Sequence, residues 1–211
     1  MAYAVRPMAM ADIPQVTEIE REAFLTTFPS TSYERELRNS ALSAYWVVWT
    51  TEAPAPPPRD SSFLSRLGDG LRRWLGEEPP PPTSELLVGY VGVWFLGDEA
   101  HITSIAVREP YRRRGLGQLL LATTIDAALQ RSCRVVTLEA RVSNEGAITL
   151  YERYGLHRMG VRRGYYTDNR EDAVVMSTDP LSSDAFQVHF QGLKAVLRER
   201  LNGVSAEPRE R

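Results

Sequence analysis

Three arginines stand directly before a Gly-Leu-Gly step in the segment YRRRGLGQLLL, residues 111–121. The residues before this segment have the composition of a strand, and the leucine-rich residues after it have the spacing of a helix. A glycine-rich step between a strand and a helix exposes backbone N–H groups at the positive end of the helix dipole, where anions bind. The spacing R-x-x-G-x-G at residues 112–117 therefore predicts a diphosphate site. The alternative is an arginine cluster on the surface that begins an ordinary helix.

The sequence gives no support for a nucleotide site of another type, for a metal site or for a reactive cysteine. The loop has neither the lysine and hydroxyl of a P-loop nor the G-x-G-x-x-G pattern of dinucleotide-binding folds. The three histidines form no H-x-x-x-H pair, so we expect no metal site. Cys133 is the single cysteine, has no histidine near it in sequence, and fits a small buried thiol in a reducing compartment.

The elements around the loop follow from hydrophobic spacing. We expect helices at 13–23, 33–39, 118–130 and 144–154, and strands at 4–6, 43–50, 86–96, 101–109, 134–142, 156–166 and 172–178. The tail after Pro180 carries apolar residues at helical spacing, which predicts one more helix that packs on its own chain or on a second copy. These elements indicate an α/β chain of the α+β type.

A proline-rich insertion interrupts the chain at residues 52–83. Eight prolines lie in this stretch, and proline removes the backbone donors that a sheet needs. Between the proline runs, residues 62–76 carry leucines, Trp74 and arginines at spacings typical of a short amphipathic helix. We expect either a solvated spacer or a segment that docks to a partner or a membrane surface. The predicted domains are thus residues 1–179, interrupted by the insertion, and a C-terminal helix with a disordered tail at 180–211.

Composition limits the classes of function. The chain has 211 residues, 43% of them hydrophobic, and a formal net charge of −2, so it lacks the positive field that attracts nucleic acid. The N-terminal residues do not have the pattern of a secretory signal, and no apolar run reaches the ~20 residues of a membrane span. We expect a cytoplasmic protein with no nucleic-acid partner.

Three segments together carry a family resemblance. ITSIAVREPYRRRGLGQLLL, LEARVSNEGAITLYERYGL and RRGYYTDNREDAVVM resemble, in order and spacing, the GCN5-related N-acetyltransferases, or GNAT family. Within this family the chain is most similar to the RimI type, which acetylates the N-terminal alanine of a small-subunit ribosomal protein. The resemblance implies the GNAT fold, a mixed and mostly antiparallel sheet flanked by helices, whose fourth and fifth strands splay apart to admit acetyl-CoA.

The resemblance also implies roles for individual residues. Glu139 would be the general base and Tyr151 the general acid. Asn144 would contact the cofactor. The backbone groups that would pair with the pantetheine arm belong to Ile105, Ala106 and Val107. The backbone N–H groups that would hold the diphosphate belong to Arg113, Arg114, Gly115, Leu116, Gly117 and Gln118. The alternatives are a glutamate that faces solvent or pairs with an arginine, and a core tyrosine.

The acceptor is less well defined by the sequence. Phe28, Arg141, Tyr165 and Tyr166 occupy positions that border the peptide cleft in similar enzymes, although ordinary packing also explains them. The RRGYYTDNREDA segment favours a protein N-terminus as substrate. Acetylation of a lysine side chain or a small amine, and a binding module that retained acetyl-CoA but lost catalysis, remain alternatives.

Overall fold

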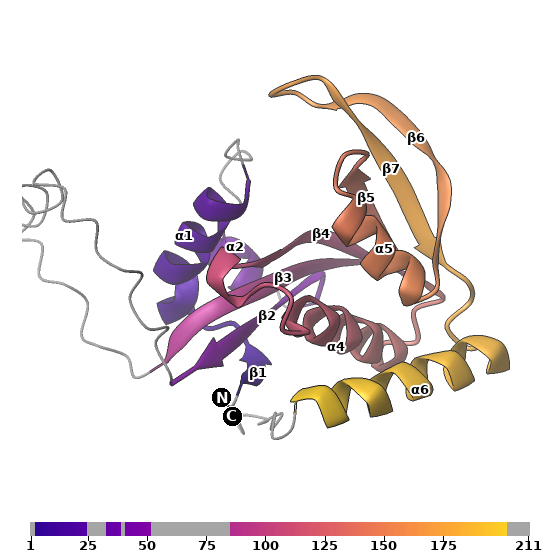
Figure 1. Ribbon diagram of the computed structural model, residues 1–211, viewed down its shortest axis with the longest axis horizontal. Coiled ribbons are helices and arrows are strands. Elements are labelled where there is room, and N and C mark those ends of the chain that lie inside the picture. The colour runs from indigo at the N-terminus through magenta and orange to yellow at the C-terminus, as the bar shows by residue number, and fades with distance from the viewer. Residues whose placement is uncertain (1–2, 25–32, 39–40, 52–84, 202–211) are drawn as a thin grey trace, which may run out of the picture.

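The computed structural model of the chain describes residues 3–24, 33–38, 41–51 and 85–201. These residues form a seven-stranded sheet in the order β1-β2-β3-β4-β5-β7-β6 (Figure 1). The strands are β1 (Ala4–Pro7), β2 (Ser43–Thr50), β3 (Leu86–Leu96), β4 (Glu99–Val107), β5 (Val135–Arg141), β6 (Leu156–Tyr166) and β7 (Glu171–Thr178). Among the described strands, β4 and β5 pair in parallel and the other neighbours are antiparallel, so the predicted fold class is confirmed.

Helices cover both faces of this sheet (Figure 1). They are η1 (Met10–Asp12), α1 (Ile13–Ala23), α2 (Tyr33–Arg38), η2 (Glu109–Tyr111), α4 (Leu116–Gln130), α5 (Glu145–Arg153) and α6 (Asp184–Leu201). Because side chains alternate across a strand, neighbouring residues of β3 pack against helices on opposite faces of the sheet. Leu87 packs with α1 and Val88 with α4; a bulge at Val88, where Val48 of β2 pairs with Gly89 and Trp49 with Leu87, shifts the alternation, so that Tyr90 packs with α1 and Val91 with α4. A strand covered on both sides is buried almost throughout, as β3 is from Leu87 to Val93.

The helix predicted in the tail is α6, and it packs on its own chain. Four apolar side chains of α6 are buried in the core cluster that also contains Leu116 and Leu120 of α4; they are Phe186, Phe190, Leu197 and Leu201. Lys194 of α6 also forms an ion pair with Asp126 of α4 at 2.7 Å. The prediction of packing on the chain's own surface is therefore confirmed.

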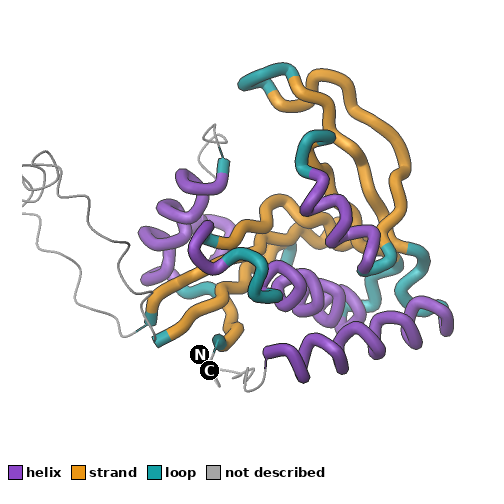
Figure 2. Tube along the Cα trace, viewed as in Figure 1, coloured by secondary structure: helices purple, strands orange, loops and turns teal. Residues whose placement is uncertain are grey.

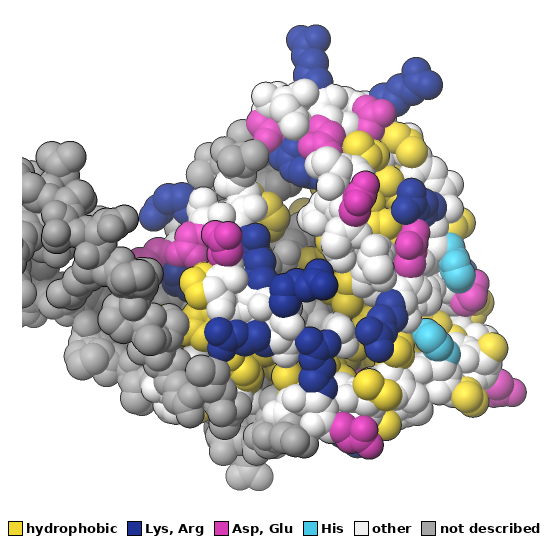
Figure 3. Space-filling model, in the orientation of Figure 1, with side chains coloured by type: hydrophobic (Ala, Val, Ile, Leu, Met, Phe, Trp, Pro, Cys, Tyr) yellow, Lys and Arg dark blue, Asp and Glu magenta, His cyan; other side chains and the backbone are white. Residues whose placement is uncertain are grey.

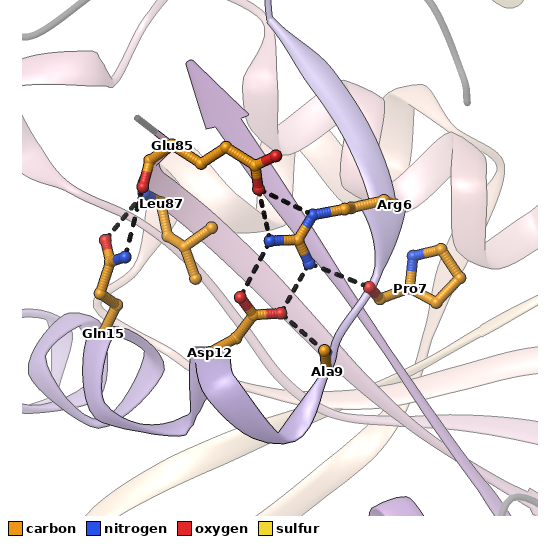
Figure 4. Close-up of polar contacts among 7 residues, drawn as sticks. All are labelled: Arg6, Pro7, Ala9, Asp12, Gln15, Glu85 and Leu87. Atoms are coloured by element: carbon orange, nitrogen blue, oxygen red, sulfur yellow. Dashed lines mark hydrogen bonds and ion pairs between the residues drawn. The ribbon is translucent and has the colours of Figure 1, made fainter. Parts of the chain in front are cut away.

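A buried polar network fastens β1 to the start of β3 (Figure 4). Arg6 is buried and binds Asp12 with two hydrogen bonds of 2.6 and 2.9 Å. Its guanidinium also binds Glu85 at 2.7 Å. These hydrogen bonds, that to Asp12 first, hold the pKa of Arg6 above its ordinary value. Gln15 donates to the carbonyl of Glu85 and accepts from the backbone N–H of Leu87, so α1 also holds this end of β3.

The insertion predicted at residues 52–83 lies outside the described residues, but the strands that flank it are in place. Thr50 at the end of β2 pairs directly with Leu86 at the start of β3. Cα atoms of directly opposed residues in an antiparallel pair lie ~4.5–5.5 Å apart. The chain therefore leaves the sheet and re-enters it at neighbouring positions.

Candidate functional site

Two adjacent strands separate near the centre of the sheet. β4 and β5 pair from Glu99 opposite Val135 to Ile102 opposite Leu138, and their pairing stops there. Both strands continue, β4 to Val107 and β5 to Arg141, and Figure 1 shows them diverging. The backbone of β4 at residues 103–107 is consequently left without a strand partner on the β5 side. A polar chain can bind there as an added strand does at a sheet edge.

The loop between β4 and α4 has the backbone of an anion site. Arg113 and Gly115 both have positive φ values, 63° and 91°. Residues in left-handed conformations turn successive N–H groups toward one side, which makes a concavity for anions. Gly115 is the N-cap of α4, so the helix begins at Leu116, two residues before the predicted start, and its dipole points at the loop.

A cavity of about 600 Å³ lies between this loop, the free end of β4 and α5. This volume is typical of small-molecule sites. The cavity brings together ten of the residues that the sequence predicted for cofactor and catalysis: Ile105, Ala106, Val107, Arg113, Gly115, Leu116, Gly117, Gln118, Asn144 and Tyr151. These ten residues extend over 46 positions in sequence, from Ile105 to Tyr151, yet they line the same cavity.

The charge of the cavity suits a ligand with several phosphates. Four arginines line it, Arg112, Arg113, Arg153 and Arg200, and among the described residues of its lining there is no aspartate or glutamate. Figure 3 shows basic side chains gathered at the centre of this face, over the segment between β4 and α4. Arginine donates in a planar fork that matches phosphate oxygens. The residues present therefore fit the phosphates of coenzyme A.

Two of the predicted cofactor residues have structural contacts of their own. The Asn144 side chain accepts from the backbone N–H of Ala147 at 3.3 Å, so Asn144 caps α5 and also lines the cavity. Arg114 is not part of the described lining, because its side chain donates to the hydroxyl of Tyr3 and the carbonyl of Pro110. We therefore expect the backbone N–H of Arg114, rather than its side chain, to be the group that meets an anion in the loop.

Glu139, the predicted base, lies on β5 with its side chain only 7% exposed. Its two carboxylate oxygens have different partners: Nε2 of His101 lies 3.2 Å from Oε2, and Nη1 of Arg162 lies 3.0 Å from Oε1. The alternative that Glu139 pairs with an arginine is present in the structure, and the partner is Arg162 of β6. Glu139 is not in the described lining of the cavity and lies beside it, where β5 departs from β4.

Tyr151, the predicted acid, lines the cavity from α5 and is buried. Burial raises the pKa of its phenol above the ordinary value, so the hydroxyl keeps its proton at neutral pH. A buried, protonated phenol in a ligand cavity can donate a hydrogen bond to an atom that gains negative charge. A tyrosine that only packs in the core would be equally buried, but its hydroxyl would have no role in the reaction.

Two of the predicted acceptor residues, Tyr165 and Tyr166, lie on the β6–β7 hairpin, and Arg141 contacts this hairpin from β5. Figure 2 shows these two strands extending beyond the end of β5. Tyr165 and Tyr166 meet edge to face with ring centroids 5.2 Å apart, and Tyr165 is 38% exposed. Burial raises the pKa of Tyr166 to about 12. Arg141 stacks 3.9 Å from the Tyr166 ring and forms ion pairs with Asp168 and Glu171, so its contacts organise the hairpin. Phe28 lies outside the described residues.

Sequence reasoning missed three residues near these groups. His101 contacts Glu139 because the parallel register places it opposite Thr137, two residues before Glu139, and a register between distant strands has no local signal. Arg153 reaches the cavity from the last turn of α5, seven residues after Gly146 and three after Leu150, a spacing that puts all three on one helical face. Arg200 reaches it from α6, and nothing in the sequence links these segments.

The described residues contain neither a cluster suited to a metal ion nor a helix suited to a membrane. In those ranges no cluster of three or more His, Cys, Asp or Glu side chains is arranged to hold a metal ion. No described helix is both long and apolar enough to span a membrane.

Comparison with known proteins places this geometry in a family. The profile of the Acetyltransferase (GNAT) family matches residues 13–156. A Bacillus subtilis (strain 168) protein, provisionally named a ribosomal protein bS18-alanine N-acetyltransferase, is 32% identical over 82% of this chain and 93% of its own. The enzyme of that name from Salmonella typhimurium is 43% identical over 67% of this chain and 93% of its own. The crystal structure of the Escherichia coli ribosomal-protein-S18-alanine N-acetyltransferase matches with a TM-score of 0.60 and 26% identity, over 86% of this chain and 95% of that one.

Proposed function

This chain belongs to the GNAT family of acetyltransferases, and from this premise we propose that its acceptor is the N-terminal α-amine of a protein. The chain is an acetyl-CoA-dependent N-acetyltransferase. The acceptor that its relatives' names support is the N-terminal alanine of ribosomal protein bS18. The observation that carries the proposal is the single cavity where the splayed β4 backbone, the arginine-rich loop and Tyr151 meet, with Glu139 at its side.

The cofactor's phosphates and its acyl arm need different partners, and the cavity offers both. Backbone N–H groups of residues 113–118, at the start of α4, suit the diphosphate. The β5-facing side of the backbone at Ile105, Ala106 and Val107, which has no strand partner, suits the amide groups of the pantetheine arm. A backbone N–H near Ile105 is also the donor that we propose for the negative charge that develops on the thioester oxygen. Acetyl-CoA supplies the activated acyl group when it is bound.

Acetyl transfer requires a neutral amine, and Glu139 is the proposed base. An α-amine has a pKa of ~7.7–8.0, against ~10.4 for lysine, so an N-terminus loses its proton more readily at neutral pH. Because His101 and Arg162 already contact both oxygens of Glu139, we propose that the carboxylate takes the proton through a water molecule between it and the amine. His101 and Arg162 would then hold the carboxylate in one orientation.

Departure of the thiolate requires a proton, and Tyr151 is the proposed donor. Its phenol has an ordinary pKa of ~10, which burial raises further, so it carries its proton at neutral pH. Tyr165 and Tyr166, with Phe28 and Arg141, are the proposed contacts of the acceptor peptide. The edge-to-face tyrosine pair gives a rigid aromatic surface on the hairpin, and such surfaces bind extended peptides at low cost in conformational entropy.

A panel of acceptors tests the proposed function. The purified chain is mixed with acetyl-CoA and three acceptors: a peptide with the N-terminal sequence of bS18, the same peptide with a blocked N-terminus and a free lysine, and a polyamine. Mass spectrometry should show one acetyl group on the N-terminal alanine of the first peptide and little product with the other two. Preferential acetylation of the lysine or the polyamine would replace the proposed acceptor with that class.

A further inference from the structure

The C-terminal helix reaches the cofactor cavity at its rim. Nη2 of Arg200 donates to the backbone carbonyl of Arg113 at 2.8 Å. Leu197 and Leu201 are buried on either side of it in sequence, and a Cβ at Gly115 would lie 3.4 Å from Leu197 and 3.5 Å from Leu201. The last turn of α6 thus packs directly against the loop that begins α4.

These contacts fix where the Arg200 guanidinium lies. One of its five N–H donors binds the Arg113 carbonyl, and Arg200 is part of the cavity lining. Arg113 itself has a positive φ of 63°, which is uncommon for a residue with a side chain, so a bond to its carbonyl stabilises an unfavourable backbone. Arg200 therefore belongs to the site by position and by its contact with the anion loop.

Coenzyme A carries phosphate in two places, the diphosphate and the 3′-phosphate of the ribose. The N–H groups of residues 113–118 and the helix dipole suit the diphosphate. The 3′-phosphate needs other donors, and a doubly charged phosphate pairs best with guanidinium groups. Arg200 donates to a carbonyl of the loop and lies on α6, which is separate from both the loop and β4, so it supplies a donor apart from the N–H groups that suit the diphosphate.

We infer that Arg200 binds the 3′-phosphate of coenzyme A and that α6 is, through this residue, part of the cofactor site. The inference rests on the cofactor position proposed above. It gives the helix after β7 a role in ligand recognition in addition to its role in the core. It also assigns the chain a preference for coenzyme A over 3′-dephospho-coenzyme A.

Calorimetric titration of the purified full chain with both ligands tests the inference. The unmodified chain should bind coenzyme A about tenfold more tightly than 3′-dephospho-coenzyme A, as expected for one lost charged contact. Arg200→Gln should bind coenzyme A about tenfold more weakly and 3′-dephospho-coenzyme A as before, so the preference disappears. Arg198→Gln is the matched control, since Arg198 is exposed in the same helical turn but is not in the described lining, and it should keep the preference.

Other outcomes would contradict either the role of Arg200 or the proposed cofactor site. If Arg200→Gln weakens both ligands equally, Arg200 supports the loop or the diphosphate and does not recognise the 3′-phosphate. If neither affinity changes, Arg200 does not contact the ligand. Failure of the unmodified chain to bind coenzyme A would instead contradict the proposed cofactor site itself. A thermal melt of each variant excludes unfolding as the cause, because Arg200 is exposed and its loss should leave the core intact.

Discussion

At the scale of single residues, Glu139 has the most restrictive surroundings of the proposed catalytic groups. Its carboxylate lies between His101 and Arg162, and its side chain is only 7% exposed. A base held in this way cannot move toward its substrate, so it acts only on a proton that the acceptor brings within reach. The pH dependence of its contribution should therefore follow the protonation of the acceptor amine.

Glu139→Gln should lower turnover on an N-terminal peptide by about 10²-fold at pH 6.5, where the amine is an ammonium and a base is required. The deficit should shrink as pH rises past the amine pKa of ~7.7–8.0, because the amine then loses its proton without help. Glu152→Gln, which removes a surface glutamate paired with Arg158, is the control. Initial rates measured across pH 6–9 test this prediction. Equal rates for Glu139→Gln and the unmodified chain at pH 6.5 would show that Glu139 is not the general base.

Gly146 offers a direct probe of the cavity. It lines the cavity in the first turn of α5, and a Cβ added there meets nothing within 4 Å. Gly146→Asp should therefore fold normally, since a carboxylate in a first helical turn is favourable, yet it places a negative charge beside the phosphates. The KM for acetyl-CoA should rise about tenfold, a loss of ~1.4 kcal/mol.

Gly146→Ala is the matched variant, and its KM for acetyl-CoA should not change. Gly115 is a poorer choice for such a probe. Its φ of 91° strains any other residue, and its Cβ would point at Leu197 and Leu201 of α6. An unchanged KM in Gly146→Asp would place the cofactor elsewhere.

At the scale of elements, the β6–β7 hairpin is held by charges near its turn. Glu171 accepts from the backbone N–H of Ser143 and from Asn169, and it pairs with Arg141. These bonds, led by those from Ser143, lower the pKa of Glu171 to about 2. A carboxylate whose pKa is lower in the folded state stabilises that state above its unfolded pKa of ~4.3, and this stabilisation is lost as pH falls toward 2.

Glu171→Gln should lower the melting temperature modestly at pH 7, because solvent screens these exposed bonds. The difference from the unmodified chain should be constant between pH 7 and pH 5 and should shrink as the pH falls from about 5 to about 2. Differential scanning calorimetry at several pH values provides the measurement. A difference that is as large at pH 2 as at pH 7 would show that the carboxylate charge is not what stabilises the hairpin.

Most elements could be predicted from local pattern, and the contacts between them could not. Period-two and helical spacing are properties of neighbouring residues, so the strands and helices of the described ranges fall close to their predicted positions. The meeting of His101 with Glu139 depends on the register of two strands, and that of Arg200 with Arg113 on the docking of a helix. Such contacts are decided by packing over the whole chain, where sequence separation is large and local signals are absent.

At the scale of the whole molecule, the insertion is predicted to be separable from the fold. Thr50 and Leu86 are direct partners in the sheet, and Glu85 and Leu87 are held by Arg6 and Gln15. Replacing residues 52–83 with a four-residue Gly/Ser turn keeps every one of these contacts. Because loop length changes closure entropy slowly, the free energy of unfolding should change by only ~1–2 kcal/mol.

The shortened chain should melt cooperatively and acetylate a free peptide at an unchanged rate, as thermal melting and peptide turnover measured together will show. Activity on an intact ribosomal protein should fall if residues 62–76 dock to that partner. A matched control replaces the same residues with a Gly/Ser linker of equal length, which separates the effect of sequence from that of length. Loss of the cooperative melt in both proteins would show that the segment belongs to the core.

The contact between Arg200 and Arg113 also has a consequence for synthesis on the ribosome. The two residues are 87 positions apart, and protein synthesis adds about 5–20 residues per second. The anion loop therefore emerges roughly 4–17 s before the helix that contacts it. During that interval a nascent chain can form the sheet around β3 and β4 but not the finished rim of the cavity. Competence to hold the acyl donor is thus acquired only once α6 has been synthesised, after most of the described core is already made.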